Sequence, residues 1–469
     1  MERLSSSDAW FLDIESTTVP MHVTGLLLLD PSTAGSHWSP EVLRHNVGAK
    51  LAAIDSLRQV LVEVPLGIDH PTWRPAAPQI DDHVHHLTAR GRRPGRLGAL
   101  MSAFATAPLD RSRPLWEALV IDGLDDGRIA FAIKVHHAIA DGVTGLELLT
   151  QILDLSPEPT APPGAAEVLR STEPPTAVAT FAAALTHRAA TPLRPIRAAA
   201  GLGAAAARLA RRVADTDTER AAHPLGAPRT PFNGTLTERR AVAFGQLPLS
   251  DFKHVARAAD ATVNEVVLAM VTFALRRNLQ RSRRLPDRSL ICSVPVSTHG
   301  RSMKQSANHV SDMFVPLPVH LDDPVDRLRA VHEGCVEAKA VQRSLGADVI
   351  GDLVELLPGG MLRLGAGLYS RAGLADRLAP IHNVIVSNVA GPPVPLYLEG
   401  AEVVGLYPFG PLVEGTGVNI TVFSNAGRMN VGVITCPELL PRPGTVLADL
   451  RRGMDELLAA IELAPKGTT

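Results

Sequence analysis

Two adjacent histidines and an Asp-Gly pair are the residues of this chain whose types and spacing best suit chemistry. His136 and His137 precede Asp141 and Gly142 in the segment KVHHAIADGVTG, residues 134–145. An imidazole with the ordinary pKa of about 6.5 is largely neutral at neutral pH, so it can accept a proton as a general base. A nearby carboxylate can hold a loop by accepting backbone N–H bonds or by pairing with an arginine, and glycine allows a tight turn. By composition alone the pattern HHxxxDG is rare, so it indicates catalysis rather than packing.

The elements around this motif predict how its side chains are positioned. Apolar residues recur with period two in RIAFAIKV, residues 128–135, which predicts a strand. His137 continues the apolar side of that strand and His136 the opposite side, so the two imidazoles cannot do the same job. Helical spacing of apolar residues resumes after Gly142, which places Asp141 at a helix N-terminus, where a carboxylate is favourable. We therefore predict that His137 is the base and that the other three residues shape its loop.

Length and composition favour a globular α/β protein of two domains. A chain of 469 residues is too long for one ordinary core, and 45% of its residues are hydrophobic. The net charge of −2 provides no field that would attract nucleic acid, so we expect no such partner. The three cysteines lack CxxC spacing, which argues against a disulfide framework and a zinc site and favours the cytoplasm. We find neither a signal peptide nor an apolar stretch of about 18 residues, so we do not expect a membrane span.

Strand-like and helical patterns occur in both halves of the chain. In the first half, residues 22–30 read as a strand and residues 40–54 as a helix. The second half should contain one or two helices over residues 249–279. Its expected strands cover residues 241–249, 289–297, 382–391, 418–427 and 428–435. We divide the chain into an N-terminal domain (1–155), a Pro- and Ala-rich linker with a basic helical crossover (156–234), and a C-terminal domain (235–469).

The crossover between Glu173 and Asp215 has six arginines and no acidic residue between those ends. A basic, weakly amphipathic helix of this kind can rest on anionic lipid headgroups. It can equally be a solvated connection that the arginines keep soluble. Peripheral contact with the inner membrane face or a lipid-droplet surface therefore stays open. The arginines are Arg188, Arg194, Arg197, Arg208, Arg211 and Arg212.

HHxxxDG resembles the signature of the CoA-dependent acyltransferase superfamily, and further segments resemble the bacterial wax ester synthase/diacylglycerol acyltransferases within it. The matches run in order from about residue 4 to residue 455. This resemblance implies two chloramphenicol-acetyltransferase-like α/β domains with mixed sheets and a tunnel between the domains. The matching segments are LSSSDAWFLDIE (4–15), PMHVTGL (20–26), RPLWEALVIDGL (113–124), TPFNG (230–234), TVNEVVLAM (262–270), VPVST (294–298) and VSNVAGPPVPLYLEGAEV (386–403).

The resemblance also implies an activity. A long-chain fatty acyl group would move from acyl-CoA to diacylglycerol, giving triacylglycerol, and/or to a long-chain alcohol, giving a wax ester. Acyl-CoA would be a substrate, and neither a cofactor nor a metal is expected. His137 would take the hydroxyl proton and the alkoxide would attack the thioester directly, in keeping with a chain that has no GxSxG motif. Asn264 and the backbone of Gly142 are candidates for the oxyanion donor.

Other site residues are carried over from the matching segments as substrate-binding residues. The apolar PLW triplet fits a plain core equally well. The pair at 264–265 reads Asn-Glu where the family usually has Asn-Asp, and Ser424-Asn425 and Cys436 also depart from the family pattern. These departures suggest an altered acceptor preference or weak activity. The carried-over residues are Pro114, Leu115, Trp116, Asn264, Glu265, Ser387 and Asn388.

Two alternative functions fit the same sequence motifs. The chain could be a condensation-type acyltransferase fed by a carrier protein, or a lipid-binding homologue without activity.

Two further motifs resemble functional sites but do not fit them. DDHVHHL (81–87) aligns His83 and His85 on one strand face, but no third metal ligand follows by spacing, so we interpret both as solvated strand histidines. NHVSD (308–312) is similar to the NHxSxxD motif of glycerol-phosphate acyltransferases, but Phe314 stands where that motif needs Asp.

Overall fold

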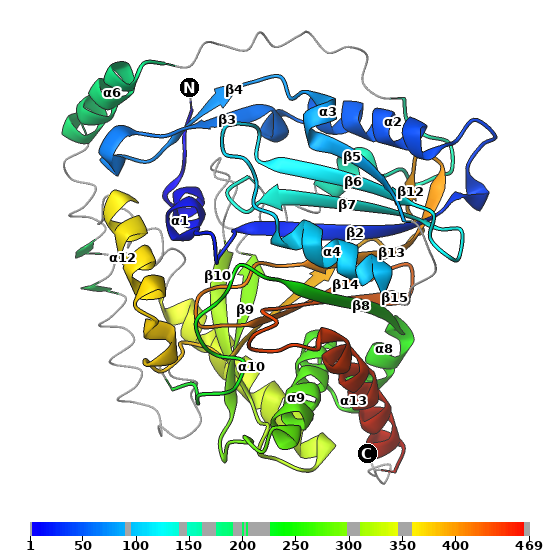
Figure 1. The fold of residues 1–469 in the computed structure, drawn as a ribbon. Coiled ribbons are helices and arrows are strands. Elements are labelled where there is room, and N and C mark those ends of the chain that lie inside the picture. Colours follow the sequence, from blue (N-terminus) through cyan, green and yellow to red (C-terminus); the bar gives the residue numbers. More distant parts are fainter. Residues whose placement is uncertain are drawn as a thin grey trace.

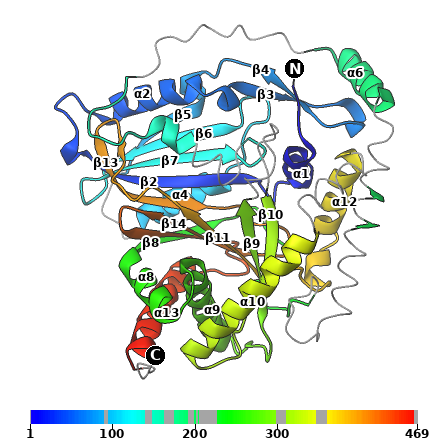
Figure 2. The same ribbon diagram turned by 180° about the vertical axis from the view of Figure 1, so that it is seen from behind.

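Two six-stranded mixed sheets form the framework of the computed structural model (Figures 1 and 2). The structure describes residues 2–89, 95–139, 148–161, 175–190, 199–200, 203–204, 226–297, 310–345 and 359–463. The first sheet has the order β12-β13-β2-β7-β6-β5, and the second has the order β10-β9-β11-β14-β15-β8. Parallel and antiparallel pairs occur in both sheets, so the predicted mixed α/β class is confirmed.

The strands have the following bounds. The first sheet contains β2 (His22–Asp30), β5 (Val84–Thr88), β6 (Trp116–Asp122), β7 (Ile129–His136), β12 (Tyr397–Leu398) and β13 (Ala401–Phe409). The second contains β8 (Ala241–Pro248), β9 (Leu290–Ser297), β10 (Val310–Leu317), β11 (Val384–Ala390), β14 (Val418–Asn425) and β15 (Arg428–Thr435). A small third sheet consists of β1 (Glu2–Arg3), β4 (Thr72–Pro75) and β3 (Gln59–Val62).

Apolar periodicity predicted most of these strands. The expected strand at residues 22–30 is β2, residue for residue, and the run at 128–135 becomes β7 with a shift of one residue. The five strands predicted in the second half are β8, β9, β11, β14 and β15. In β14, buried residues fill nearly every position, as expected for a strand covered on both faces. The strand predictions are therefore confirmed.

Two strands cross from the second half of the chain into the first sheet. β13 pairs antiparallel with β2, with Phe409 opposite Thr24 and Glu402 opposite Asp30. β12 then extends this sheet as its edge strand. The two sheets thus do not divide the chain at residues 155 and 234, since residues 397–409 belong to the sheet built mainly by the first half. This exchange binds the two halves together.

Helices pack on each sheet and between the two halves. α9 (Val263–Arg281) is almost wholly buried and packs against α13 (Pro443–Leu463), α10 (Pro324–Leu345) and α8 (Leu249–Ala258). On the first sheet lie α2 (Pro40–Ala53), which begins after the N-cap Ser39, and α3 (Ile80–His83). α4 (Arg96–Thr106) packs against β8 of the second sheet. The remaining described helices are α1 (Ser6–Ile14), α6 (Ala177–Ala190), α12 (Gly359–Arg371), η1 (Pro31–Thr33), η2 (Asp55–Arg58), η3 (Pro65–Gly67) and η4 (Leu374–Asp376).

None of the helices in the described ranges is, by itself, long and apolar enough to cross a bilayer. α8 and α9 reach that hydropathy only as a pair bent by 101°.

Candidate active site

A cavity of about 300 Å³ lies where the two halves of the chain meet. Its N-terminal wall comes from α1, β2, β7 and residues 148–152. Its C-terminal wall comes from β9, β10, β11, β13, β14 and the segments beside them. A volume of this size is within the range of small-molecule sites. The sheet exchange described above is the reason that both halves line one space.

His137 follows β7 directly and lines the cavity together with Ile133 and Val135. Its backbone N–H donates to the carbonyl of Met21 over 2.7 Å, and its ring stacks on Phe11 with centroids 4.0 Å apart. The ring is half-buried and borders the cavity. The predicted side of the strand is therefore confirmed, and the imidazole is open to a ligand in the cavity.

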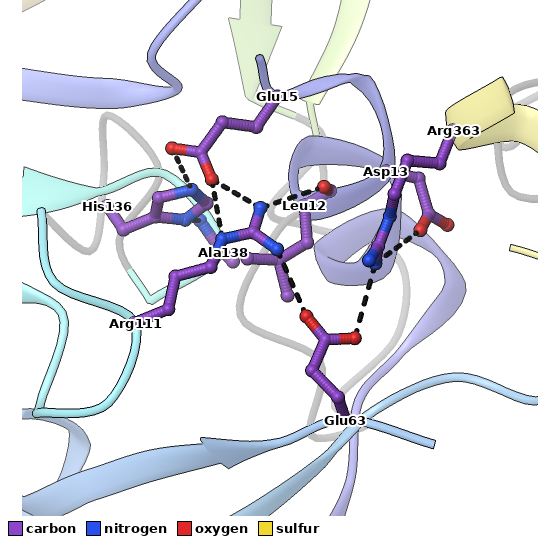
Figure 3. A network of polar contacts seen from close by, with 8 residues as sticks. All are labelled: Leu12, Asp13, Glu15, Glu63, Arg111, His136, Ala138 and Arg363. Atoms are coloured by element: carbon purple, nitrogen blue, oxygen red, sulfur yellow. Dashed lines mark hydrogen bonds and ion pairs between the residues drawn. The ribbon is translucent and has the colours of Figure 1, made fainter. Parts of the chain in front are cut away.

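His136 points to the other side of the strand and is buried. The backbone N–H of Ala138 donates to its Nδ1 over 3.0 Å, so in the neutral ring the proton is on Nε2. Nε2 lies 3.4 Å from Oε1 of Glu15 (Figure 3). The backbone N–H of His136 donates to Leu115. His136 thus anchors the turn that presents the neighbouring imidazole.

Glu15 and Arg111 complete this anchor (Figure 3). Nε of Arg111 donates to Oε2 of Glu15 over 2.8 Å, and Arg111 also bonds to the Leu12 carbonyl and to Glu63. Burial alone would raise the pKa of Glu15, but the hydrogen bonds and charges of His136 and Arg111 lower it to about 2. The carboxylate is therefore ionised at neutral pH. The predicted residues Asp141 and Gly142 lie outside the described residues.

The PLW residues lie in the core of the first half. Pro114, Leu115 and Trp116 are buried, and none of them is among the residues that line the cavity. The indole N–H of Trp116 donates to the Leu57 carbonyl over 2.9 Å. Trp116 begins β6, and Pro114 and Leu115 directly precede it. Its contact with a substrate stays a prediction.

One of the two histidines interpreted as solvated is instead buried, so that interpretation is wrong for His83. The chain changes from α3 to β5 at Val84, so His83 ends a helix while His85 is an exposed strand residue. Nδ1 of His83 bonds to the Trp116 carbonyl over 2.7 Å and the two rings stack. Burial lowers the pKa of His83. In the described ranges no three His, Cys, Asp or Glu side chains are grouped to hold a metal ion.

Glu265 stabilises the start of α9. Its side chain accepts the backbone N–H of Thr262 over 2.9 Å, while the Thr262 hydroxyl accepts the backbone N–H of Glu265, which is a capping box. His332 and Lys339 lie beside the carboxylate. Burial would raise the pKa of Glu265, but the hydrogen bonds from Thr262 and His332 lower it. This buried carboxylate thus forms hydrogen bonds at the start of α9, and its contact with a substrate stays a prediction.

Of the two predicted β11 residues, only Ser387 lines the cavity. Side chains of a strand alternate, so Asn388 points the other way, where its amide donates to Asn264 over 3.4 Å. The structure therefore joins Asn264 to Asn388 and places Ser387 in the same cavity as His137. An oxyanion donor remains a prediction for Asn264.

Two titratable residues in the cavity were not predicted from the sequence. Asp312 of β10 and His382, just before β11, both line the C-terminal wall. Burial raises the pKa of Asp312, with an opposing hydrogen bond from Ser293, and burial lowers the pKa of His382 to about 4. Asp312 lies in NHVSD and His382 begins the strand-like run at 382–391, but no spacing rule links either to His137.

Comparisons with known proteins agree with this arrangement. The model of the wax ester synthase/diacylglycerol acyltransferase catalytic domain matches residues 4–267, and the model of the WS/DGAT C-terminal domain matches residues 306–458. A putative diacylglycerol O-acyltransferase of Mycobacterium tuberculosis CDC 1551 is 34% identical, over 100% of this chain and 92% of the relative. A second one, from strain H37Rv, is 33% identical over 99% and 97%.

Solved structures show the same relationship. The wax ester synthase/diacylglycerol acyltransferase from Marinobacter aquaeolei VT8 is 27% identical with a TM-score of 0.69, over 99% of this chain and 100% of that one. The first condensation domain of the CDA synthetase, 17% identical with a TM-score of 0.56 over 100% and 97%, shares the fold. With both family models matched in order and the histidine motif at a cavity between the halves, the chain belongs to the wax ester synthase/diacylglycerol acyltransferase family.

Proposed function

We propose that this protein transfers a long-chain fatty acyl group from acyl-CoA to the hydroxyl of diacylglycerol and/or a long-chain alcohol. The observation that carries the proposal is the half-buried imidazole of His137 on a cavity lined by both halves. The names of the relatives support an O-acyl transfer with diacylglycerol as acceptor. Acyl-CoA is the substrate in this proposal, and the reaction needs no cofactor.

The reaction begins at the imidazole of His137. Its unprotonated nitrogen takes the acceptor's hydroxyl proton while the oxygen attacks the thioester carbonyl. The tetrahedral intermediate then collapses, the C–S bond breaks, and the imidazolium returns the proton to the CoA thiolate. His136, held by Glu15 and Ala138, fixes the backbone that carries the base. The apolar N-terminal wall, with Ile14, Leu27 and Ile152 among its residues, suits an acyl chain.

The direct test is turnover of labelled palmitoyl-CoA with dioleoylglycerol or hexadecanol. We expect the His137→Ala variant to lose activity by about 10²- to 10⁴-fold, the range for loss of a general base. His85→Ala, which removes an exposed imidazole of β5, is the matched control and should keep wild-type activity. Equal product from the wild type and His137→Ala would refute the base. Turnover only with an acyl-carrier-protein donor would favour a condensation-type enzyme.

We also propose peripheral contact with an anionic lipid surface at the inner membrane face or a lipid droplet, from the cytoplasmic side. Exposed apolar side chains occur on η3, α6 and α12. η3 contacts both helices, and α6 and α12 lie on the same side of the molecule in both views (Figures 1 and 2). Leu66 is 86% exposed, Val178 79% and Leu364 76%. α12 also packs against α1, whose residues Trp10 and Phe11 line the cavity. Of the six crossover arginines for which lipid contact was left open, Arg188 lies in α6 and the other five lie outside the described residues.

Sedimentation with phosphatidylglycerol vesicles tests this contact. The double variant Leu364→Glu/Leu368→Glu should bind at least about tenfold more weakly, because it places charge on the exposed apolar face of α12. Leu463→Glu changes an equally exposed leucine at the far end of α13 and should bind as the wild type does. Equal binding by all three proteins would refute the surface.

A further inference from the structure

The two walls of the cavity differ in polarity. The N-terminal wall is mainly apolar. The C-terminal wall has polar side chains among its apolar ones, and a cavity that held only hydrocarbon chains would leave such groups without partners. The polar residues of this wall are Ser293, Asp312, His382, Ser387, Asn419 and Thr421.

Part of this polarity is satisfied within the wall. The Thr421 hydroxyl donates to Oδ1 of Asn419 over 3.1 Å, and the Asn419 amide donates to the Pro411 carbonyl over 2.9 Å. These two residues therefore have no need of a ligand. The groups that can serve a ligand lie elsewhere on the wall.

Asp312 is the carboxyl that reaches the cavity. The side chain of Asp312 is exposed and lines the cavity. Protein atoms nevertheless surround the carboxyl group, and this burial raises its pKa. The Ser293 hydroxyl bonds to it, and no charged group of the described residues shifts its pKa. The raised pKa means that Asp312 keeps its proton to a higher pH than an exposed carboxyl does, and in its protonated form it can donate a hydrogen bond as well as accept one.

His382 is held firmly by its backbone. Its carbonyl accepts hydrogen bonds from Asn233 and Thr416, each over 3.3 Å. The following residue, Asn383, exchanges two hydrogen bonds with Ile291. Asn233 belongs to the TPFNG segment, so that motif positions this part of the wall. The site of the ring is thus fixed before any ligand arrives.

The ring of His382 is neutral at neutral pH and lines the cavity, yet neither ring nitrogen has a hydrogen-bond partner among the described residues. Both ring nitrogens are covered by protein, so a ligand reaches one of them only when the ring makes a half-turn about the Cβ–Cγ bond, which exchanges its nitrogen and carbon edges. Phe314, two residues beyond Asp312 on the same face of β10, lies 6.2 Å from this ring, centroid to centroid. Asp312 and His382 thus both belong to the C-terminal wall of the cavity.

Resting on the acyl transfer proposed above, we propose that Asp312 and His382 bind the ester carbonyls of the acceptor, so that the enzyme prefers a glycerolipid such as diacylglycerol to a plain alcohol. An ester carbonyl accepts a hydrogen bond, whereas an alkyl chain in the same place leaves these groups unpaired. A site built to pair polar groups rejects the analogue that lacks them.

The test compares three acceptors: dioleoylglycerol, its diether analogue without ester carbonyls, and hexadecanol. The wild type should favour the diester over the diether by about tenfold in kcat/KM, as expected when one or two hydrogen bonds are lost. Asp312→Leu and His382→Phe should each remove most of that preference, and Asp312→Asn should retain it. Thr421→Val, on the same wall but already paired, should change the ratio by less than about twofold.

Binding measured without turnover separates this proposal from the proposed function. Trp10 lines the cavity, so its fluorescence in the His137→Ala background reports lipid binding, with Trp10→Phe as the blank. Tighter binding of diester than of diether, lost in Asp312→Leu, supports the subsite even if no acceptor is turned over. Equal binding of both lipids overturns it. A uniform loss with all acceptors and a raised KM for palmitoyl-CoA also overturns it, since the wall would then bind the donor.

Thermal unfolding checks that each variant folds. If a variant does not fold, Ser293→Ala is the milder substitution on the same wall.

Discussion

At the scale of single residues, the two histidines have different roles in the proposed proton transfer. His137 borders the cavity, while His136 is buried and takes one hydrogen bond from Ala138. Glu15 lies against the other side of the His136 ring, and Arg111 holds Glu15. The ion pair therefore acts through the second imidazole on the position of the first.

The lowered pKa of Glu15 predicts a pH-dependent contribution to stability. A shift from its ordinary value of 4.5 to about 2 corresponds to roughly 3 kcal/mol, with the carboxylate favoured in the folded state. This stability is present above about pH 4.5 and is lost as the pH falls towards 2. Urea unfolding of the wild type and Glu15→Gln should differ most at neutral pH, with the difference shrinking as the pH falls. Glu41→Gln, at an exposed site, is the control. A difference that stays constant with pH would contradict the prediction.

At the scale of elements, the beginning of α9 brings several predicted residues together. Thr262 and Glu265 cap the helix, and Asn264 binds Asn388 of β11. The glutamate at 265, where the family usually has aspartate, is long enough to reach back to the Thr262 N–H and to lie beside His332. The glutamate that departs from the family pattern thus caps the start of α9.

Removing the cap should weaken this element. Thr262→Ala deletes the hydroxyl that accepts the Glu265 N–H, so we expect the free energy of unfolding to fall by about 1 kcal/mol. Thr262→Ser keeps that hydroxyl and should lose much less. Urea unfolding at neutral pH measures both. Equal losses in the two variants would show that the methyl group, rather than the cap, is responsible.

At the scale of the whole molecule, the passage of β13 between the halves decides where the cavity forms. β13 pairs with β2 of the first sheet and packs against β14 and β15 of the second. Gly432 of β15 lies so close to β13 that a Cβ atom there would overlap the Pro408 carbonyl oxygen. Glycine is therefore needed at this contact for its lack of a side chain.

Gly432→Ala should push β13 away from β15. Since the overlap is with backbone, we expect a loss of at least about 1–3 kcal/mol in the free energy of unfolding, with lower soluble yield. Gly444→Ala, where an added Cβ meets nothing, should stay within about 0.5 kcal/mol. Urea unfolding of both proteins decides the point. A Gly432→Ala protein as stable as the wild type would mean that β13 can move freely.

Local periodicity determined much of this protein from the sequence alone. Alternating apolar residues located β2 and β7 and placed His137 on the apolar side of its strand, because side-chain direction in a strand depends only on position along it. The order of the motifs was enough to assign the family. DDHVHHL was misjudged because α3 gives way to β5 at Val84 and because His83 packs against Trp116, which lies far away in the sequence.

Only the tertiary structure decided which distant residues share a site. Glu15 and Arg111 meet at His136, and Asp312 and His382 join His137 around one cavity, because strand order and the crossing of β13 bring separate segments together. The alternation of residues along one strand does not say which distant strands become its neighbours. Sequence periodicity therefore predicted the side of the strand on which a side chain lies, and sheet topology decided which distant residues lie near it.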